Sequence, residues 1–300
     1  MKAGRALNVF SELLAIACFS YACSAGAAPF ASGASEHSLD IAGTPIRVYA
    51  YKPAAYEAGP ILIVLHGLGR NAAGYRDYAR PLADRYGYLV IAPLLDRERF
   101  PTWRYQHGGI ARPGQREGVV QPEPRALWTG EIIEQVVHAV RDMEEDSKRE
   151  YSVLGHSAGA QALARYAAFT ADQAAHIIVA NPSTYLWPSR EVRYPYGYGG
   201  LPAELADETA LRRYLAQPLV VLLGTADVKQ DRDLNVTAEA MAQGAYRYER
   251  GLNFFRAGAR LAQERGWRFA WRLIAVPGVG HSARGMFASD AAAAAFADQP

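Results

Sequence analysis

Short, unbroken apolar runs recur along the chain and are separated by stretches of mixed polarity. Runs of this length suit strands that are buried on both faces of a parallel sheet. The predicted buried strands are residues 60–65, 88–93, 152–156, 176–182, 219–227 and 269–276. Residues 38–43 and 46–52 instead alternate between apolar and polar side chains, which predicts two half-buried strands joined by a turn.

Helical patterns fill the gaps between these runs. Helices are predicted over about 72–86 and over the Ala-rich run 160–168, with further helical material between residues 227 and 266. One face of another helix is marked by Leu127, Ile132, Ile133, Val136, Val137 and Val140. Alternating strands and helices predict one doubly wound, mostly parallel sheet with an antiparallel pair at its amino-terminal edge. Ligands of such sheets bind beyond the carboxyl ends of the strands.

Two segments, 94–125 and 183–202, lack this periodicity and are rich in Gly, Pro and aromatic residues. Irregular segments of this length are usually functional or mobile, and we expect the second to cover part of the site like a small lid. Their aromatic side chains either line an apolar acyl or aryl pocket or pack on the surface. These side chains are Phe100, Trp103, Tyr105, Tyr185, Trp187, Tyr194, Tyr196 and Tyr198, and the candidate pocket residues are Trp103, Tyr105, Tyr185 and Trp187.

The amino terminus has the layout of a secretory signal peptide. Lys2 and Arg5 precede an apolar stretch over 13–22, and a run of small residues follows at 24–28. The apolar stretch is shorter than the roughly 20 residues that span a membrane, so we expect removal of residues 1–28 and no stable membrane span afterwards. Residues 29–300 then form one catalytic domain without cysteine, because Cys18 and Cys23 both lie in the leader. We therefore expect a periplasmic or secreted protein.

Charge narrows the range of partners. Acidic and basic residues nearly balance, and the net charge is +2, so nothing favours a nucleic-acid partner or an anionic membrane surface. A small-molecule substrate is the remaining expectation, and the oligomeric state stays open.

The chemistry is carried first by Gly155-His156-Ser157-Ala158-Gly159, which lies between a predicted strand and a predicted helix. A Gly-x-Ser-x-Gly motif in this context holds its serine on a sharp turn, with the hydroxyl above the sheet. Ser157 is therefore the candidate nucleophile.

Asp227 and His281 follow two later predicted strands, so Ser157, Asp227 and His281 all fall at strand carboxyl ends in the order nucleophile, acid, base. A serine hydroxyl needs a base near neutral pKa, and imidazole fits that need. Asp231 and Asp233 are alternatives for the acid, but they lie beyond the strand end, where they would cap a helix or bind a cation weakly.

An oxyanion needs two backbone N–H donors aimed at it. One is expected from Ala158, directly after the nucleophile, and the other from Leu68 in the glycine-rich loop His66-Gly67-Leu68-Gly69. His66 is expected to brace this loop rather than to act as the base.

These motifs resemble the α/β-hydrolase fold family across nearly the whole mature chain. The segments 66–71, 155–159, 224–227 and 280–282 look like the exported esterases grouped with poly(3-hydroxybutyrate) depolymerases and feruloyl esterases. The resemblance implies carboxylic-ester hydrolysis through an acyl-enzyme on Ser157, with no cofactor and no metal. Many members of that group carry disulfides, whereas the mature chain here has no cysteine, and no polymer-binding module follows, so a soluble ester is favoured over an insoluble polymer.

Two further hypotheses remain. The same catalytic groups would serve a serine peptidase or an acyltransferase, and fold alone does not choose among these reactions. A binding protein on this fold that has lost catalysis is the alternative of another class. The acyl and alcohol groups of the substrate are left undetermined by the residues.

Overall fold

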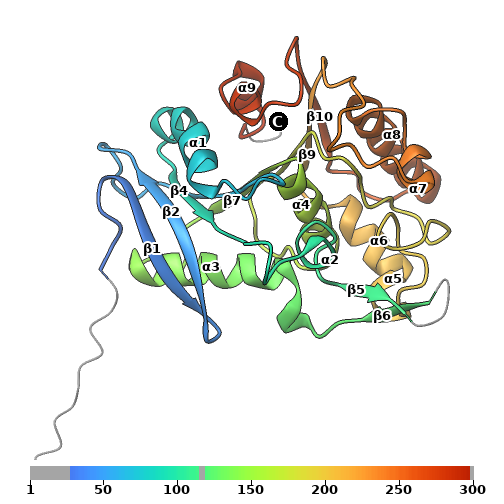
Figure 1. Ribbon diagram of the computed structural model, residues 1–300, viewed down its shortest axis with the longest axis horizontal. Helices are drawn as coiled ribbons and strands as arrows, with labels where there is room; N and C mark the ends of the chain where they lie inside the picture. The colour runs from blue at the N-terminus through green and yellow to red at the C-terminus, as the bar shows by residue number, and fades with distance from the viewer. Residues whose placement is uncertain (1–27, 115–118, 298–300) are drawn as a thin grey trace, which may run out of the picture.

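The computed structural model describes residues 28–114 and 119–297, and the leader expected over residues 1–28 lies almost wholly outside this range. An eight-stranded sheet runs through the molecule in the order β1-β2-β4-β3-β7-β8-β9-β10 (Figure 1). Its strands are β1 (Gly33–Ile41), β2 (Thr44–Lys52), β3 (Ile61–Leu65), β4 (Leu89–Pro93), β7 (Tyr151–His156), β8 (Ile177–Ala180), β9 (Leu219–Gly224) and β10 (Arg272–Val276).

The sheet is parallel from β4 to β10, and β1 and β2 form the antiparallel edge. The doubly wound sheet with an antiparallel amino-terminal edge, predicted from the sequence, is therefore confirmed. The last strand begins at Arg272, three residues later than predicted.

Helices cover both faces of the sheet. One face packs against α1 (Ala72–Tyr86), α9 (Ala283–Phe287) and α10 (Asp290–Ala294). The other packs against α3 (Thr129–Met143), α4 (Ala158–Phe169), α6 (Glu208–Leu215) and α8 (Arg247–Arg265). Along β3, Leu62 and Val64 join the first core, and Ile61, Ile63 and Leu65 join the second. This double burial explains why the central strands read as unbroken apolar runs.

The irregular segments contain little regular structure. Residues 94–125 include α2 (Thr102–Tyr105) and the paired short strands β5 (Ala111–Pro113) and β6 (Val120–Pro122), and the 3₁₀ turn η1 (Arg125–Leu127) follows at their end. Within 183–202, an isolated bridge joins Arg193 and Gly199. The short helices α5 (Ala203–Ala206) and α7 (Ala238–Met241) complete the described elements.

The parallel arrangement determines where the candidate residues lie. β3, β7, β9 and β10 point the same way, so the loops after their carboxyl ends meet on one rim of the sheet. Ser157, Asp227, His281 and the loop at Leu68 follow these four strands. No helix in the described ranges is long and apolar enough to cross a membrane.

Candidate active site

Ser157 lies on the sharp turn between β7 and α4. Its backbone has φ 56° and ψ −114°, and its amide donates to the carbonyl of Ala180 at 3.0 Å. A non-glycine residue at positive φ is strained, and such strain is typical of functional turns. The two glycines of the motif allow close packing here: a Cβ on Gly155 would lie 2.5 Å from the carbonyl carbon of Gly159, and one on Gly159 would lie 2.4 Å from the carbonyl oxygen of Leu65.

A continuous chain of hydrogen bonds joins Ser157, His281 and Asp227. The Oγ of Ser157 lies 3.0 Å from Nε2 of His281, and Nδ1 of His281 lies 2.8 Å from Oδ2 of Asp227. The Asp227 side chain is 1% exposed, whereas that of His281 is 21% exposed. With a proton on Nδ1, the imidazole donates to Asp227 and offers a free lone pair on Nε2 to the serine hydroxyl. The three groups predicted from the sequence are thus brought together in the order that proton transfer requires.

The second oxygen of Asp227 faces a buried arginine. Nη1 of Arg247, the first residue of α8, lies 3.4 Å from Oδ1 of Asp227. The same guanidinium binds both oxygens of Asp231 at 2.8 Å. Asp231 is therefore an ion-pair partner of Arg247 and does not contact His281 by a hydrogen bond. Burial opposes the charge on Arg247, but the Asp231 and Asp227 carboxylates outweigh burial and raise the pKa of Arg247.

Leu68 and Ala158, whose amides are predicted to bind the oxyanion, both line the cleft around Ser157. Neither amide has a hydrogen-bond partner in the described part of the chain, as an oxyanion site requires. The loop before Leu68 is braced from α1, since the Tyr75 hydroxyl would lie 2.5 Å from a Cβ on Gly67 and is 3.0 Å from Nδ1 of His156. Glycine at position 67 thus lets the Tyr75 hydroxyl approach the loop closely.

The other histidines near the site are held neutral by burial. His66 binds the carbonyl of Gly67 and accepts from the amide of Leu95, and burial lowers its pKa to about 4. Burial also lowers the pKa of His156, whose ring lies 4.6 Å from that of His281, and lowers the pKa of His107 to about 3. The ring hydrogen bonds and the burial of His66 fit the structural role that the sequence predicted for it.

The cleft around Ser157 has a volume of about 280 Å³ and is lined largely by polar groups. Its polar lining comes from Asn71, Tyr75, Tyr78, Gln106, His156, Ser157, Gln161, Ser183, Asp233 and His281. Gln106 also borders the cleft, and its Oε1 has no hydrogen-bond partner in the described part of the chain. The immediate surroundings of the serine suit a polar group more than an alkyl chain.

A larger cavity, of about 1000 Å³, lies beside this cleft. Trp103, His107, Tyr194 and Tyr196 are among its lining residues, so both irregular segments contribute walls. Gln106 borders the cleft and the next residue, His107, borders the cavity. The amide of Asn235 donates to Oγ of Ser183 at 2.9 Å and its Nδ2 donates to the Tyr196 hydroxyl at 3.0 Å, which links the two spaces on the other side.

The four aromatic residues considered from the sequence do not form one pocket. Trp103 lines the large cavity, where the guanidinium of Arg112 lies 3.7 Å from its ring centroid. Tyr105 and Tyr185 line neither space because both are fully buried. The Tyr105 hydroxyl donates to the carbonyl of His66, and Tyr185 stacks on Phe254.

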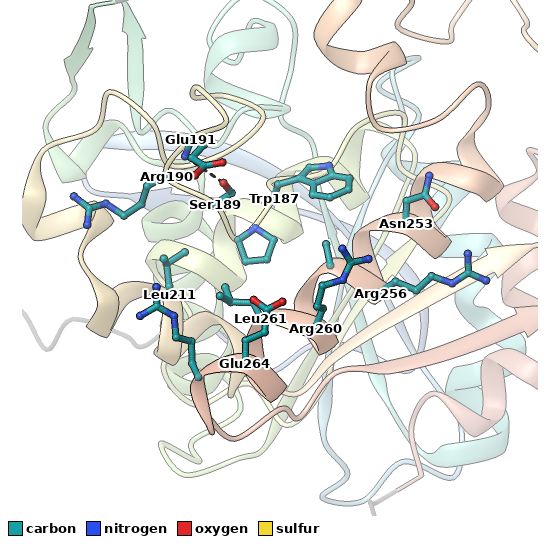
Figure 2. A pocket seen from close by; sticks show the side chains of 13 residues that line it. Trp187, Ser189, Arg190, Glu191, Leu211, Asn253, Arg256, Arg260, Leu261 and Glu264 are labelled. Atoms are coloured by element: carbon teal, nitrogen blue, oxygen red, sulfur yellow. Dashed lines mark hydrogen bonds between the residues drawn. The ribbon is translucent and has the colours of Figure 1, made fainter.

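Trp187 lies in a separate cavity of about 760 Å³ between the second irregular segment and α8. Figure 2 shows Trp187 and Ser189 on one side of this cavity and Arg260 and Glu264 rising from α8 on the other. Trp187 is not among the residues that line the serine cleft.

Sequence reasoning missed several residues at the site. Tyr75 and Arg247 lie in predicted helical stretches, where their type gave no sign of a role in the site. Gln161 follows the nucleophile by one helical turn, so its place near Ser157 could have been found from the 3.6-residue period. Gln106 lies in an irregular segment, where no pattern indicated its direction.

Solved structures resemble this chain over most of its length. A poly(aspartic acid) hydrolase-1 from Sphingomonas sp. KT-1 is 35% identical, with a TM-score of 0.78 over 86% of this chain and 96% of that one. LpqC, a poly(3-hydroxybutyrate) depolymerase from Bordetella parapertussis, is 30% identical, with a TM-score of 0.79 over 87% and 90% of the two chains. An S-formylglutathione hydrolase from Agrobacterium tumefaciens shares the fold at 17% identity, with a TM-score of 0.53 over 89% and 96%. No protein-family model and no curated protein matches the chain.

Proposed function

Since the chain belongs to the α/β-hydrolase fold family and its similar structures are hydrolases, we propose that it is a serine hydrolase that cleaves carboxylic esters. The observation that carries the proposal is the hydrogen-bond chain from Ser157 through His281 to Asp227, at 3.0 and 2.8 Å. Ser157 is its nucleophile, His281 its base and Asp227 the acid that orients the imidazole.

In the proposed reaction, Oγ of Ser157 forms a bond to the ester carbonyl carbon while Nε2 of His281 takes the hydroxyl proton. The amides of Leu68 and Ala158 receive the resulting oxyanion. The carbon–oxygen bond to the alcohol then breaks, and the alcohol leaves with the proton from His281. Water, deprotonated by His281, cleaves the acyl-enzyme and regenerates the serine. This chemistry needs no cofactor or metal.

The cavity lined by Trp103 is proposed to hold the larger part of the substrate, beyond the polar cleft. Its volume lies at the upper end of the range of small-molecule sites, and its aromatic walls suit an apolar or aryl group. Its tyrosine walls are Tyr194 and Tyr196, and not the fully buried Tyr105 and Tyr185 that were considered from the sequence.

Amide hydrolysis is the second candidate, because one 35% identical neighbour is a hydrolase of poly(aspartic acid), whose units are joined by amide bonds. The other neighbour acts on a polyester according to its name. Both bond types react through the same tetrahedral intermediate, so the catalytic groups serve either. Because both of these neighbours are named for polymers, a polymer substrate is a candidate for this chain beside the soluble ester.

The experiment is hydrolysis of p-nitrophenyl acetate, butyrate, octanoate and palmitate by the mature protein, beside Ser157→Ala. We expect turnover of the esters that disappears in the variant. Oligomers of 3-hydroxybutyrate and of aspartate, tested in parallel, separate ester from amide preference. A folded wild type that hydrolyses none of these would contradict the proposal, and failure of a fluorophosphonate to label Ser157 would favour a binding role.

We also propose export, on the pattern of residues 1–28 alone. Expression of the full-length chain in a Gram-negative host should yield a protein in the periplasm or the medium that lacks the leader. Amino-terminal sequencing is expected to place the first residue close to Pro29. A full-length chain retained in the cytoplasm would contradict export.

A further inference from the structure

Arg247 contacts the proposed acid, Asp227, and Asp231 binds Arg247. Neither residue belongs to the Gly-x-Ser-x-Gly motif. Arg247 has no exposed side-chain surface, while the Asp231 side chain is 40% exposed. A buried arginine is stable only when its charge is compensated, and both nearby carboxylates contribute. The two-pronged bond to Asp231, at 2.8 Å on each side, orients the guanidinium plane.

The distances around Arg247 are unequal. Asp231 holds the guanidinium at 2.8 Å, whereas the contact from Nη1 to Oδ1 of Asp227 is 3.4 Å. Without Asp231, the guanidinium of Arg247 would be drawn toward the buried carboxylate of Asp227. There it would compete with His281 for the oxygens of Asp227. Asp231 thus keeps the arginine close enough to orient Asp227, yet leaves Oδ2 to the imidazole at 2.8 Å.

Charge also balances around the imidazole. Asp227 and Asp231 carry two negative charges and Arg247 one positive charge, so the cluster has a net charge of −1. When His281 takes the serine proton, its positive charge completes a neutral group. The hydrogen bond from Arg247 is the main cause that lowers the pKa of Asp231 to about 2, and the charge of the protonated His281 ring adds to this effect without a direct hydrogen bond.

We propose that Arg247 and Asp231 are positioning residues that align Asp227 and set the net charge facing His281. This inference rests on the proposed function, since it concerns the base of that reaction. It assigns a role to a partly exposed carboxylate, Asp231, which the sequence analysis considered as an alternative acid, a helix cap or a weak cation ligand.

The other groups that face His281 do not provide this balance. From β7, the His156 ring lies 4.6 Å from that of His281 at a tilt of 37°, and it stays neutral because burial, then the charges of His281 and Arg247, lower its pKa. From α1, Tyr75 and Tyr78 border the cleft, and burial raises the pKa of Tyr75. Asp233 borders the same cleft and has its Oδ1 3.7 Å from Nε of Arg232.

The test is an NMR titration of the His281 ring without substrate, in the wild type, Asp231→Asn, Arg247→Met and the double variant. The ring resonance is assigned as the one that is missing in His281→Gln. Asp231→Asn removes a negative charge, so the titration midpoint should fall by about half a pH unit. Arg247→Met removes a positive charge, so the midpoint should rise by up to about one pH unit. The double variant restores the net charge and should return close to the wild type.

A role in folding alone would not give shifts of opposite sign, so equal midpoints in wild type and Asp231→Asn would overturn the proposal. Arg247→Lys keeps the charge but not the two-pronged bond, so its midpoint should stay near that of the wild type. This variant and Asp231→Asn keep the test usable if Arg247→Met does not fold. Glu208→Gln is the matched control, because it breaks another carboxylate–arginine pair, with Arg265 at 2.6 Å, and should leave the midpoint unchanged.

The titration needs no substrate, so an absence of esterase activity would refute the proposed function without affecting this test. With a substrate in hand, Asp231→Asn should lower kcat about 10-fold and leave KM within about twofold, because alignment acts after binding. A change confined to KM would contradict a role in positioning Asp227.

Discussion

The two sides of His281 are held by different physical means. On the Ser157 side, the imidazole meets an uncharged hydroxyl on a strained turn, beside the buried neutral ring of His156. On the Asp227 side, it meets a cluster of three charges in which Arg247 joins two carboxylates. The serine side therefore depends on close backbone packing, and the acid side depends on charge. Substitutions that affect packing or charge separately should distinguish them.

The largest effect is expected at the serine itself. Ser157→Ala should lower kcat for p-nitrophenyl butyrate by at least about 10⁴-fold, because the nucleophile is lost. Thermal unfolding should change little, since among the described residues the hydroxyl makes a hydrogen bond only to His281.

His281→Gln should cause a similar loss, and the double variant should lose no more than either single one, because the residues act as a unit. Additive losses would show that Ser157 and His281 act independently.

The serine side should be the more sensitive to backbone crowding. Gly155→Ala places a methyl group 2.5 Å from the backbone of Gly159, so the turn must shift, at a cost of about 2–3 kcal/mol in the free energy of unfolding. Urea unfolding measures it.

Gly69→Ala is the control for stability, because a Cβ there meets nothing within 4 Å. Its free energy of unfolding should lie within about 0.5 kcal/mol of the wild type. Equal losses in both variants would contradict the packing argument.

The same contrast explains what could be read from the sequence. Ser157 and its glycines form one local motif, and Asp227 and His281 follow apolar strands whose ends must share a rim, so pattern and topology sufficed. Arg247 reaches Asp227 from 20 residues away at the start of a helix, and its burial depends on how α8 packs. The directions of Tyr105 and Tyr185 likewise depend on the tertiary packing of irregular segments, which have no period to indicate a buried face.

A smaller effect, on acyl-chain preference, should separate two tryptophans that line different cavities. Trp103→Ala should change the acyl-chain preference in kcat/KM by about 5- to 10-fold, because it removes a wall of the cavity beside the serine cleft. Trp187→Ala is the matched variant, since Trp187 lines the cavity against α8 (Figure 2). Its preference should stay within about twofold of the wild type across the p-nitrophenyl ester series. A larger change in Trp187→Ala than in Trp103→Ala would indicate that the substrate binds in the cavity against α8 instead.

The smallest effect concerns acid. His66 is buried and His107 is half-buried, and burial lowers their pKa values to about 4 and about 3, whereas a histidine of the unfolded chain takes up its proton near pH 6.5. Their contribution to stability is complete above pH 6.5 and is lost as pH falls toward 4 and 3. The free energy of unfolding should therefore decrease by up to about 1.4 kcal/mol per pH unit for each histidine below pH 6.

His107→Gln should reduce this slope, which urea unfolding at pH 7, 6 and 5 would reveal. Asp231, on the charged side, would add to acid loss only below about pH 4, because its pKa is lowered to about 2. A wild-type stability that stays constant from pH 7 to 5 would contradict the neutral state of the buried rings.

The most direct test of Ser157 as the nucleophile is to identify the residue that becomes covalently modified. The mature protein is treated with a fluorophosphonate and digested, and the adduct is located by mass spectrometry, with His281→Gln and Asp231→Asn alongside. We predict one adduct, on Ser157, formed much more slowly in His281→Gln and only moderately more slowly in Asp231→Asn. An unmodified Ser157 in folded wild type, or an adduct on another residue, would contradict the assignment of Ser157, His281 and Asp227 as a catalytic unit.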